Sequence, residues 1–396
     1  MRLVHLSDLH LGYRQYQRLT PGGVNQREAD VAATFRTAID RIIALDPDLI
    51  VIAGDVFHAA RPPNQAILHA FMQFGRLVQS LPNAIVVLVA GNHDSPRSAE
   101  TGGILQLFAQ LGLHVADRDS RRLSFPDREL SVLAVPDVPG LIRPSLTPDP
   151  DARYNVLVLH GEVQGMLPAS VTSGDRAAVE ITYEELGAPH WDYVALGHYH
   201  VFREMAPNAF YSGSIDYTSA NPWGELYEER VAGIAGKGLI ERDLDSGAMH
   251  FHTLPPARPL VDLPPVSAKG LTAAETDERI RSAIEACVGG IDDKIVRLIV
   301  RDAPRHVARE LDFKAIRDYK RRALNFHLDV RRPEALRLHG QGAPGKRPSL
   351  NEIVREKLMA RPLDSDVDRT ALVERAIAYL DEAQLIGAVP TGLLDA

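Results

Sequence analysis

Five short apolar runs in the first half of this chain share one layout, because each has the length of a buried β-strand and each ends in polar residues. The runs are Leu3–Leu6, Leu49–Ala53, Ile85–Val89, Val156–Leu159 and Tyr193–Leu196. Segments with apolar positions three and four residues apart, the spacing of a helix, lie between some of them, as at 29–45 and 65–81. Together these patterns predict sheets covered by helices, and therefore an α/β or α+β fold.

Side chains that bind metal ions follow each of the five runs. They are Asp8, His10, Asp55, Asn92, His160, His198 and His200. Ligands of open α/β sheets bind beyond the carboxyl ends of the strands, so we expect these side chains to converge if the five strands lie in one layer. Asp and Asn are also common in ordinary turns, but that alternative requires all seven residues to coincide.

Oxygen and imidazole ligands without cysteine suit divalent ions such as Mn²⁺, Fe²⁺ or Zn²⁺. Seven ligands are enough for two ions that share one carboxylate. A pair of ions about 4 Å apart can bind a phosphate, activate a water molecule and stabilise an in-line displacement at phosphorus.

The composition changes after residue 254. Residues 254–259 contain three prolines and read as a linker. A second segment follows, with a helix expected at 273–287 and a strand at 294–300. Residues 294–337 hold thirteen Lys or Arg against six Asp or Glu, although the whole chain has a net charge of −8. Such a local basic excess either contacts phosphates or forms an ordinary solvated helix face.

The last part of the chain reads as a Gly/Pro-rich flexible linker at 339–348 and two helices within 349–386. The helices carry apolar stripes, formed by Leu350, Ile353, Val354, Leu358, Leu372, Val373, Ile377 and Leu380. Two short helices bury such stripes poorly by themselves. We therefore expect them to pack either on this protein or on a partner.

Composition also excludes some classes of protein. The single cysteine, Cys287, excludes an intramolecular disulfide framework and cysteine-based metal sites. The longest apolar run, Ala84–Ala90, is much shorter than the roughly 20 residues that span a bilayer. With no signal peptide expected at the N-terminus, we predict a cytoplasmic, nucleoid-associated protein without a membrane segment.

The ordered motifs resemble those of the calcineurin-like metallophosphoesterases. They are Asp8-Leu9-His10, Gly54-Asp55, Gly91-Asn92-His93-Asp94, His160-Gly161 and Gly197-His198-Tyr199-His200. The sequence around them is also similar to the nuclease subunits of SbcCD-type complexes, which belong to the double-strand-break repair nucleases. The supporting segments are His5–Gly12, Gly54–His58, Gly91–Arg97 and Tyr211–Ser214.

That resemblance implies a division of the chain into parts. Residues 1–254 would form a four-layer αββα phosphoesterase sandwich with nuclease activity, and residues 260–338 a small α+β cap domain that binds DNA. After the linker at 339–348, the helical tail at 349–386 would bind a partner.

The resemblance also implies a role for each motif residue. Asp8, His10 and His200 would hold one divalent ion, and Asn92, His160 and His198 a second. Asp55 would bridge the two ions, for which Mn²⁺ is expected and Fe²⁺ or Zn²⁺ are alternatives. The implied catalytic residues are His93, which would assist the leaving oxygen, His58, which would position the DNA end, and Asp94, which either orients His93 or caps a helix. The implied DNA contacts are Arg97, Lys320, Arg321, Arg322, Arg331 and Arg332.

The implied function is Mn²⁺-dependent cleavage of DNA ends and hairpins, with 3′-to-5′ exonuclease activity on duplexes and endonuclease activity on single strands. The implied partners are an SbcC-like coiled-coil ATPase, bound through the C-terminal helices, and a second copy of this chain. Two alternatives stay open. One is a phosphodiesterase or phosphatase for other substrates on the same fold, and the other is a DNA-end tether that mainly scaffolds the ATPase.

Overall fold

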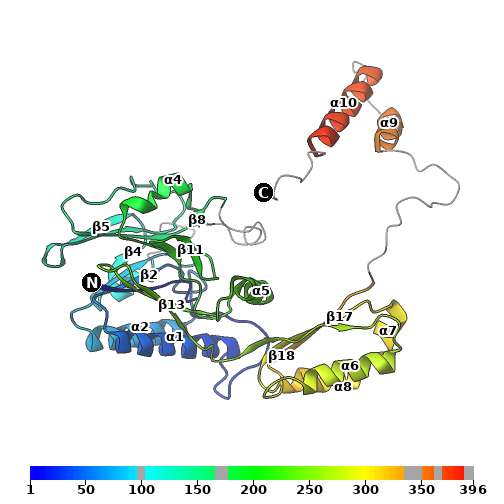
Figure 1. Ribbon diagram of the computed structural model, residues 1–396, viewed down its shortest axis with the longest axis horizontal. Coiled ribbons are helices and arrows are strands. Elements are labelled where there is room, and N and C mark those ends of the chain that lie inside the picture. Colours follow the sequence, from blue (N-terminus) through cyan, green and yellow to red (C-terminus); the bar gives the residue numbers. More distant parts are fainter. Residues whose placement is uncertain (96–102, 166–176, 334–349, 361–367, 388–396) are drawn as a thin grey trace. The chain divides into compact units, whose positions relative to one another are not determined.

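The computed structural model describes residues 1–95, 103–165, 177–333, 350–360 and 368–387. The chain divides into two compact units, Met1–Pro333 and Glu334–Ala396. The first unit contains all the sheets, and the second contains the two C-terminal helices (Figure 1). The finer division at residues 254–260 into a nuclease domain and a cap stays a prediction.

Two six-stranded sheets form most of the first unit. In spatial order, the first sheet consists of β14 (Met249–Thr253), β13 (Gly238–Asp243), β1 (Arg2–Leu6), β2 (Leu49–Ala53), β3 (Ile85–Val89) and β4 (His114–Ala116). The second consists of β11 (Arg203–Ala206), β12 (Ala209–Tyr211), β10 (Tyr193–Gly197), β7 (Tyr154–His160), β6 (Leu130–Val135) and β5 (Arg121–Phe125). Strands β1 to β4 are parallel, and so are β6, β7, β10 and β12.

The two sheets pack face to face, because strand side chains alternate between two buried layers. In β2, Val51 joins the core shared by the sheets, while Ile50 and Ile52 join a core formed with α1 (Gln26–Leu45) and α2 (Asn64–Ser80). In β7 the outward residues Leu157 and Leu159 pack with Leu186 of α4 (Tyr183–Leu186). This arrangement confirms the predicted α/β class and its αββα layering.

The five motif-bearing strands are divided between the two sheets of the sandwich. Strands β1, β2 and β3 lie in the first sheet, whereas β7 and β10 lie in the second. The alternation of β2 and β7 side chains gives the physical reason, since each sheet needs the other to bury its inner face. The carboxyl ends still meet, because His160 at the end of β7 donates a 2.8 Å hydrogen bond to the carbonyl oxygen of Ala53 at the end of β2.

Helix ends follow the local sequence. Helix α1 begins after Asn25, whose side chain accepts a hydrogen bond from the Arg27 amide, and it ends at Asp46 in a left-handed conformation. Helix α5 (Pro222–Ala232) is capped by Asn221 and ends at Gly233, also left-handed. The remaining elements of this region are α3 (Gln106–Ala109), β8 (Glu162–Val163) and β9 (Glu180–Ile181).

A smaller α+β segment completes the first unit. Its elements are β15 (Leu260–Asp262), β16 (Val266–Ser267), α6 (Ala273–Glu285), β17 (Ile295–Arg301), α7 (Arg305–Glu310), α8 (Phe313–Arg322) and β18 (Asn325–Val330). The helices cover one face of the β17 and β18 sheet (Figure 1), where Val296, Leu298 and Val300 lie in the core. On the alternate positions, the guanidinium of Arg297 lies 4.8 Å from the ring centre of Trp223 in α5.

A buried ionic network connects α1 to the linker before this segment. Arg27, whose side chain is 1% exposed, donates a 2.9 Å hydrogen bond to Asp216 and lies 3.4 Å from Asp30. Arg258 in the linker donates to the same Asp30 carboxylate at 2.7 and 3.1 Å. The linker therefore contacts the sandwich through specific charged groups.

In the second unit, α9 (Leu350–Ala360) and α10 (Arg369–Gly387) contact each other. Val373 is 2% exposed, and Val354, Leu358, Leu372 and Ile377 are partly buried. The side chains of Leu350, Ile353 and Leu380 lie outside the described residues. Of the helices described, none has the length and apolar character needed to cross a membrane.

Replacing Arg27 by Ala tests the buried network. Removing one partner of a buried ion pair leaves uncompensated charge, here on Asp216 and Asp30, so we expect a loss of about 3–5 kcal/mol in the free energy of unfolding. Urea denaturation measures it. Arg36→Ala, at an exposed position of the same helix, serves as the control and should stay within about 0.5 kcal/mol of the parent.

Candidate metal centre

The loops that follow β1, β2, β3, β7 and β10 bring the predicted ligand residues to one edge of the sandwich. Among the described residues, three groups of possible ligand atoms each lie within 4.8 Å of one another. Two contain carboxylates: the first consists of Asp8, His10 and His200, and the second of Asp8, Asp55 and His160. The third consists of His10, His58 and His93. Asp8, His10, Asp55 and His160 are all at most 2% exposed. The predicted ligands thus come together, although they belong to two different sheets.

The first group brings imidazole nitrogens close to carboxylate oxygens. The Nε2 atoms of His10 and His200 lie 3.0 Å apart. His200 Nε2 is also 4.0 Å from an oxygen of Asp8, and His10 Nε2 is 3.7 Å from an oxygen of Asp55.

The second group lies on the other side of Asp55. His160 Nε2 is 3.6 Å from the same Asp55 oxygen, Oδ2, and 3.1 Å from the side-chain oxygen of Asn92. Asp55 Oδ2 therefore lies within 3.7 Å of both the His10 and the His160 imidazole.

The donor chemistry of the second group fits a divalent cation. His160 Nδ1 donates its proton to the Ala53 carbonyl at 2.8 Å, so in the neutral ring Nε2 carries a lone pair. Nε2 faces oxygens of Asn92 and Asp55, which present lone pairs to it. Either a proton on Nε2 or a cation bound among these atoms satisfies those lone pairs. A backbone acceptor that fixes the tautomer of a histidine is typical of metal ligands.

The pKa values of the clustered residues reflect both their burial and the charges of their neighbours. Burial alone lowers the pKa of the His160 imidazole, but Asp55, Asp8 and Asp137 outweigh it and raise that pKa above its ordinary value. Burial raises the pKa of Asp55, so a carboxylate there lacks enough positive charge around it. Burial and the neighbouring histidines lower the pKa of His10 well below the ordinary value, which keeps its ring neutral and able to bind a metal.

Several of these residues have strained backbones. Asp8, His10 and Asp55 have φ angles of 54°, 46° and 52°, and His198 has 107°. Non-glycine residues rarely adopt positive φ, and they do so chiefly where the surrounding structure enforces it, as at functional sites. His198 also donates its backbone N–H to both Asp8 oxygens at 3.2 Å, and its ring centre lies 5.5 Å from that of His160.

Glycines at the strand ends allow this crowding. A Cβ at Gly197 would lie 1.7 Å from the Ala53 carbonyl oxygen, and one at Gly54 would lie 2.1 Å from His160 Nδ1. Gly54 also has a φ of 93°. The close approach of β2, β7 and β10 therefore depends on residues without side chains.

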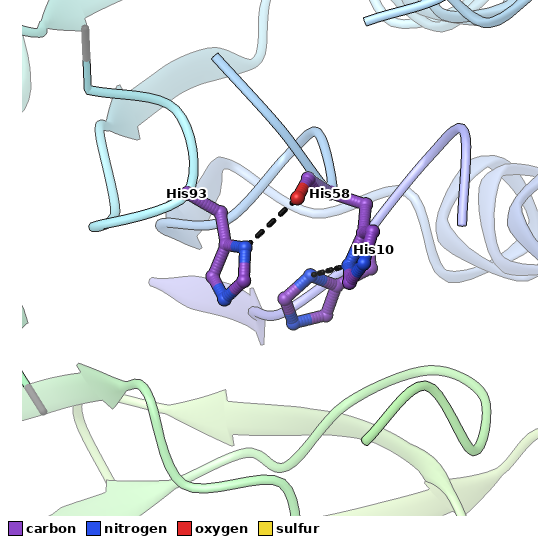
Figure 2. Close-up of side chains that lie close together, drawn as sticks. All are labelled: His10, His58 and His93. Carbon is purple, nitrogen blue, oxygen red and sulfur yellow. Dashed lines mark hydrogen bonds between the residues drawn. The ribbon is translucent and has the colours of Figure 1, made fainter. Parts of the chain in front are cut away.

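His93 and His58 line the same cluster (Figure 2). His93 Nδ1 donates a 2.8 Å hydrogen bond to the backbone oxygen of His58, and the His93 amide donates to Asp55 Oδ1 at 3.0 Å. The Nδ1 atoms of His58 and His10 lie 3.4 Å apart, and the ring centres of His10 and His93 lie 4.9 Å apart. Both histidines are partly exposed, so a substrate can reach them.

Asp94 acts on the backbone. Its carboxylate accepts hydrogen bonds from the amides of Val56, Phe57 and Gly91 at 3.0, 2.8 and 3.1 Å. Burial and the nearby Asp55 raise its pKa to about 7. These hydrogen bonds connect the loop after β2 to the loop after β3. Asp94 therefore holds the backbones of the two loops together.

The predicted DNA contacts lie away from this cluster in the chain. Arg97 falls outside the described residues. Arg322 makes a bidentate contact with Asp292 at 2.9 and 2.8 Å, Arg331 pairs with Asp329 at 2.7 Å, and Arg321 pairs with Asp318. Lys320 and Arg332 are exposed. Acidic neighbours thus compensate part of the basic excess that the sequence predicts.

Sequence reasoning missed a buried charged group behind His200. Lys237, Glu225 and Glu229 are each at most 8% exposed, and the lysine pairs with both glutamates. Burial alone raises the pKa of Glu225, but Lys237 and His200 bring it down to about 2. The Glu-x-x-x-Glu spacing in a helix is too common to single these residues out, so only the fold reveals them.

Comparison with known proteins places the cluster in a family. Residues 1–202, just over half of the 396, match the family described as calcineurin-like phosphoesterase. The chain belongs to the calcineurin-like phosphoesterase family. The match includes every residue of the three ligand groups.

Several curated relatives of this chain carry the name DNA double-strand break repair protein Mre11. The protein of Methanocaldococcus jannaschii is 25% identical over 256 residues, which cover 62% of this chain and 64% of that protein. The one from Sulfurisphaera tokodaii is 30% identical over 248 residues, covering 60% and 57%. The one from Methanosarcina mazei is 24% identical over 361 residues, covering 80% and 55%. Each match therefore spans less than two thirds of the relative, and none singles out the SbcD-type subunits.

A Gly54→Ala change tests the packing at the centre. The new Cβ would push on His160 Nδ1 and break its bond to Ala53, so we expect divalent-metal affinity to fall about 10- to 100-fold. Isothermal titration of the metal-free chain with Mn²⁺ measures this. Gly112→Ala is the matched control, because Gly112 has a similar φ of 94° but open space at its Cβ. Both variants incur backbone strain, and equal losses of affinity would argue against the specific contact.

Proposed function

We propose that this chain is a divalent-metal-dependent nuclease that hydrolyses phosphodiester bonds at DNA ends and hairpins, as the nuclease subunit of an SbcCD- or Mre11-type complex. The observation that carries the proposal is the buried cluster of Asp8, Asp55 and imidazoles at the joined ends of two sheets. The Mre11 names of the relatives favour DNA as the substrate over other phosphodiesters.

The assignment of ligands comes from the family resemblance, and the closeness of Asp8, His10 and His200 and of Asp8, Asp55 and His160 supports it. Asp8, His10 and His200 would hold one ion, Asn92, His160 and His198 the second, and Asp55 would lie between them. Two ions bound there would supply the positive charge that activates water and stabilises an in-line displacement at phosphorus. We expect Mn²⁺, with Fe²⁺ or Zn²⁺ as alternatives, since imidazole and carboxylate ligands suit all three.

In this proposal, His93 assists departure of the leaving oxygen. Its Nδ1 donates to the His58 carbonyl, which fixes the ring, and in this proposal Nε2 contacts the substrate. A protonated Nε2 donates a hydrogen bond or a proton to the 3′ oxygen as the bond to phosphorus breaks. His58, stacked on His93 with ring centres 5.2 Å apart, would contact the DNA end.

The basic residues of the segment after the linker would contact the DNA backbone. Exposed ion pairs such as Arg322–Asp292 contribute only about 0–1 kcal/mol. A guanidinium can therefore exchange its carboxylate for a phosphate at little cost. No base-reading motif is recognisable, so we expect binding through backbone and shape, with 3′-to-5′ polarity on duplex ends proposed by analogy.

Two partners belong to the proposal. The tail helices would bind an SbcC-like coiled-coil ATPase, and exposed apolar side chains there, Met359 at 52% and Tyr379 at 60%, support a binding surface. A second copy of the chain would pack on α2, where Leu68 and Met72, one turn apart, are each 62% exposed. The buried Val373 contributes to the helix pair itself.

A His93→Gln change tests the catalytic role. We expect DNA cleavage to fall by about 100-fold or more, because a general acid contributes about 10²- to 10⁴-fold, while Mn²⁺ binding stays within a factor of about three. End-labelled duplex and single-stranded DNA, assayed with Mn²⁺, Mg²⁺ or EDTA, give the readout, with bis(p-nitrophenyl) phosphate alongside. His69→Gln, a histidine on α2 outside the cluster, is the control.

The same assay separates the alternatives. Hydrolysis of the small diester with DNA left intact, even when the ATPase is present, would favour a phosphodiesterase for other substrates. Binding of DNA and ATPase without any hydrolysis would favour a tether.

Deleting residues 349–396 tests the tail. This change removes most of the second compact unit and leaves the first intact, so cleavage of small diesters should stay within about twofold of the full chain. Co-purification with the SbcC-type ATPase of the same genome should be lost. Retained co-purification would assign the ATPase contact to the first unit instead.

A further inference from the structure

Helix α5 brings a buried carboxylate to the back of His200. The Nδ1 atom of His200 lies 3.4 Å from Oε1 of Glu225, and neither of these buried atoms has a hydrogen-bond partner among the described residues. The other nitrogen, Nε2, faces His10 Nε2 at 3.0 Å and Asp8 at 4.0 Å. The imidazole therefore lies between a glutamate on one side and the proposed metal ligands on the other.

The glutamate is held in place by a buried lysine. Lys237, with a side chain that is 1% exposed, pairs with Oε2 of Glu225 and lies 3.0 Å from Oε1 of Glu229. The same ammonium donates a 2.7 Å hydrogen bond to the backbone oxygen of His200. The Lys237 ammonium thus contacts both the carboxylate of Glu225 and the backbone oxygen of His200. Moving Glu225 away would leave Lys237 with one fewer partner for its buried charge, which is costly, so the glutamate is held in place.

We propose that Glu225 is a positioning residue that orients His200 for metal binding, with Lys237 fixing the glutamate. This inference rests on the proposed function. The Glu225 carboxylate presents only lone pairs to Nδ1, so at 3.4 Å it favours the ring form with a proton on Nδ1 and a lone pair on Nε2. That lone pair then points at the space shared with His10 and Asp8. A carboxylate behind a ligating histidine commonly changes metal affinity about 10- to 100-fold.

Glu229 offers a matched control on the same helix. It pairs with the same lysine, is equally buried, and uses its other oxygen to accept a 2.6 Å hydrogen bond from the Tyr217 hydroxyl. A Glu229→Gln change removes the same charge near Lys237 without a contact to His200. If Glu225 served only to neutralise the lysine, the two substitutions would have equal effects.

The experiment is a titration of the full metal-free chain with Mn²⁺, followed by calorimetry, for the parent, Glu225→Gln and Glu229→Gln. We expect Glu225→Gln to weaken one of two binding steps about 10- to 100-fold and to leave the other unchanged. Glu229→Gln should leave both steps within about twofold. In a His200→Ala background, Glu225→Gln should have no further effect, because the two residues then act as one unit.

Cleavage provides a second readout. Raising the Mn²⁺ concentration should restore the DNA cleavage rate of Glu225→Gln to that of the parent, but it should not restore His93→Gln. Should Glu225→Gln fail to fold, Glu225→Asp keeps the charge near Lys237 while withdrawing the carboxylate from His200. The shorter side chain should then also weaken the same binding step.

Other outcomes overturn the inference. Unchanged Mn²⁺ affinity in Glu225→Gln would do so, as would equal losses in Glu225→Gln and Glu229→Gln. A shift that persists in the His200→Ala background would assign the effect to some other ligand. If the parent chain binds no divalent ion, the proposed function and this inference fail together. If Mn²⁺ binds and depends on Glu225 but DNA stays uncleaved, only the proposed nuclease function fails.

Discussion

The hydrogen bond from His160 to Ala53 joins the carboxyl ends of two sheets, and the rest of the site depends on it. Each sheet buries its inner face against the other, so the loops that follow β2, β7 and β10 must share one edge. Gly54 and Gly197 allow contacts there that any side chain would block. The same bond fixes the tautomer of His160. The packing of the two sheets therefore also determines which ring nitrogen is left for the proposed metal.

Charge explains why these side chains can stay crowded. Asp8 and Asp55 are buried beside each other, and the burial penalty on Asp55 is visible in its raised pKa. Burial and mutual repulsion keep His10 uncharged, whereas nearby carboxylates raise the pKa of His160 and of His200. Divalent ions bound as proposed above would add positive charge beside Asp8 and Asp55. Their binding would also offset part of the cost of the positive φ angles of Asp8, His10 and Asp55.

Helix α5 has contacts in two directions. Glu225 in its first turn faces His200, and Trp223 beside it lies under Arg297 of β17. A segment with a basic excess thus touches the helix that lies behind a proposed metal ligand. The linker is tied down separately through Arg258 and Asp30, so the small α+β segment contacts the sandwich at more than one point.

The sequence by itself determined the five motif-bearing strands, because both faces of each are largely buried and the strands read as continuous apolar runs. The expected strands at Leu49–Ala53 and Ile85–Val89 match the observed ones residue for residue, and the helix expected at 65–81 differs by one residue at each end. The motif order also picked out Asp8, Asp55 and His160, since ligand residues follow strand ends. For residues 1–202 it indicated the phosphoesterase family to which the chain belongs.

Only the tertiary structure decided which layer each strand joins, because a continuous apolar run indicates that both faces of a strand are buried but not what covers them. It also decided the partners of charged residues. Arg322 pairs with Asp292, thirty residues away in the sequence, whereas Arg331 pairs with Asp329, two residues away. Glu225 lies beside His200 although no local sequence pattern connects the two residues. Contacts between segments far apart in the chain depend on the packing of whole sheets and helices, and a pattern that is read along one segment does not contain them.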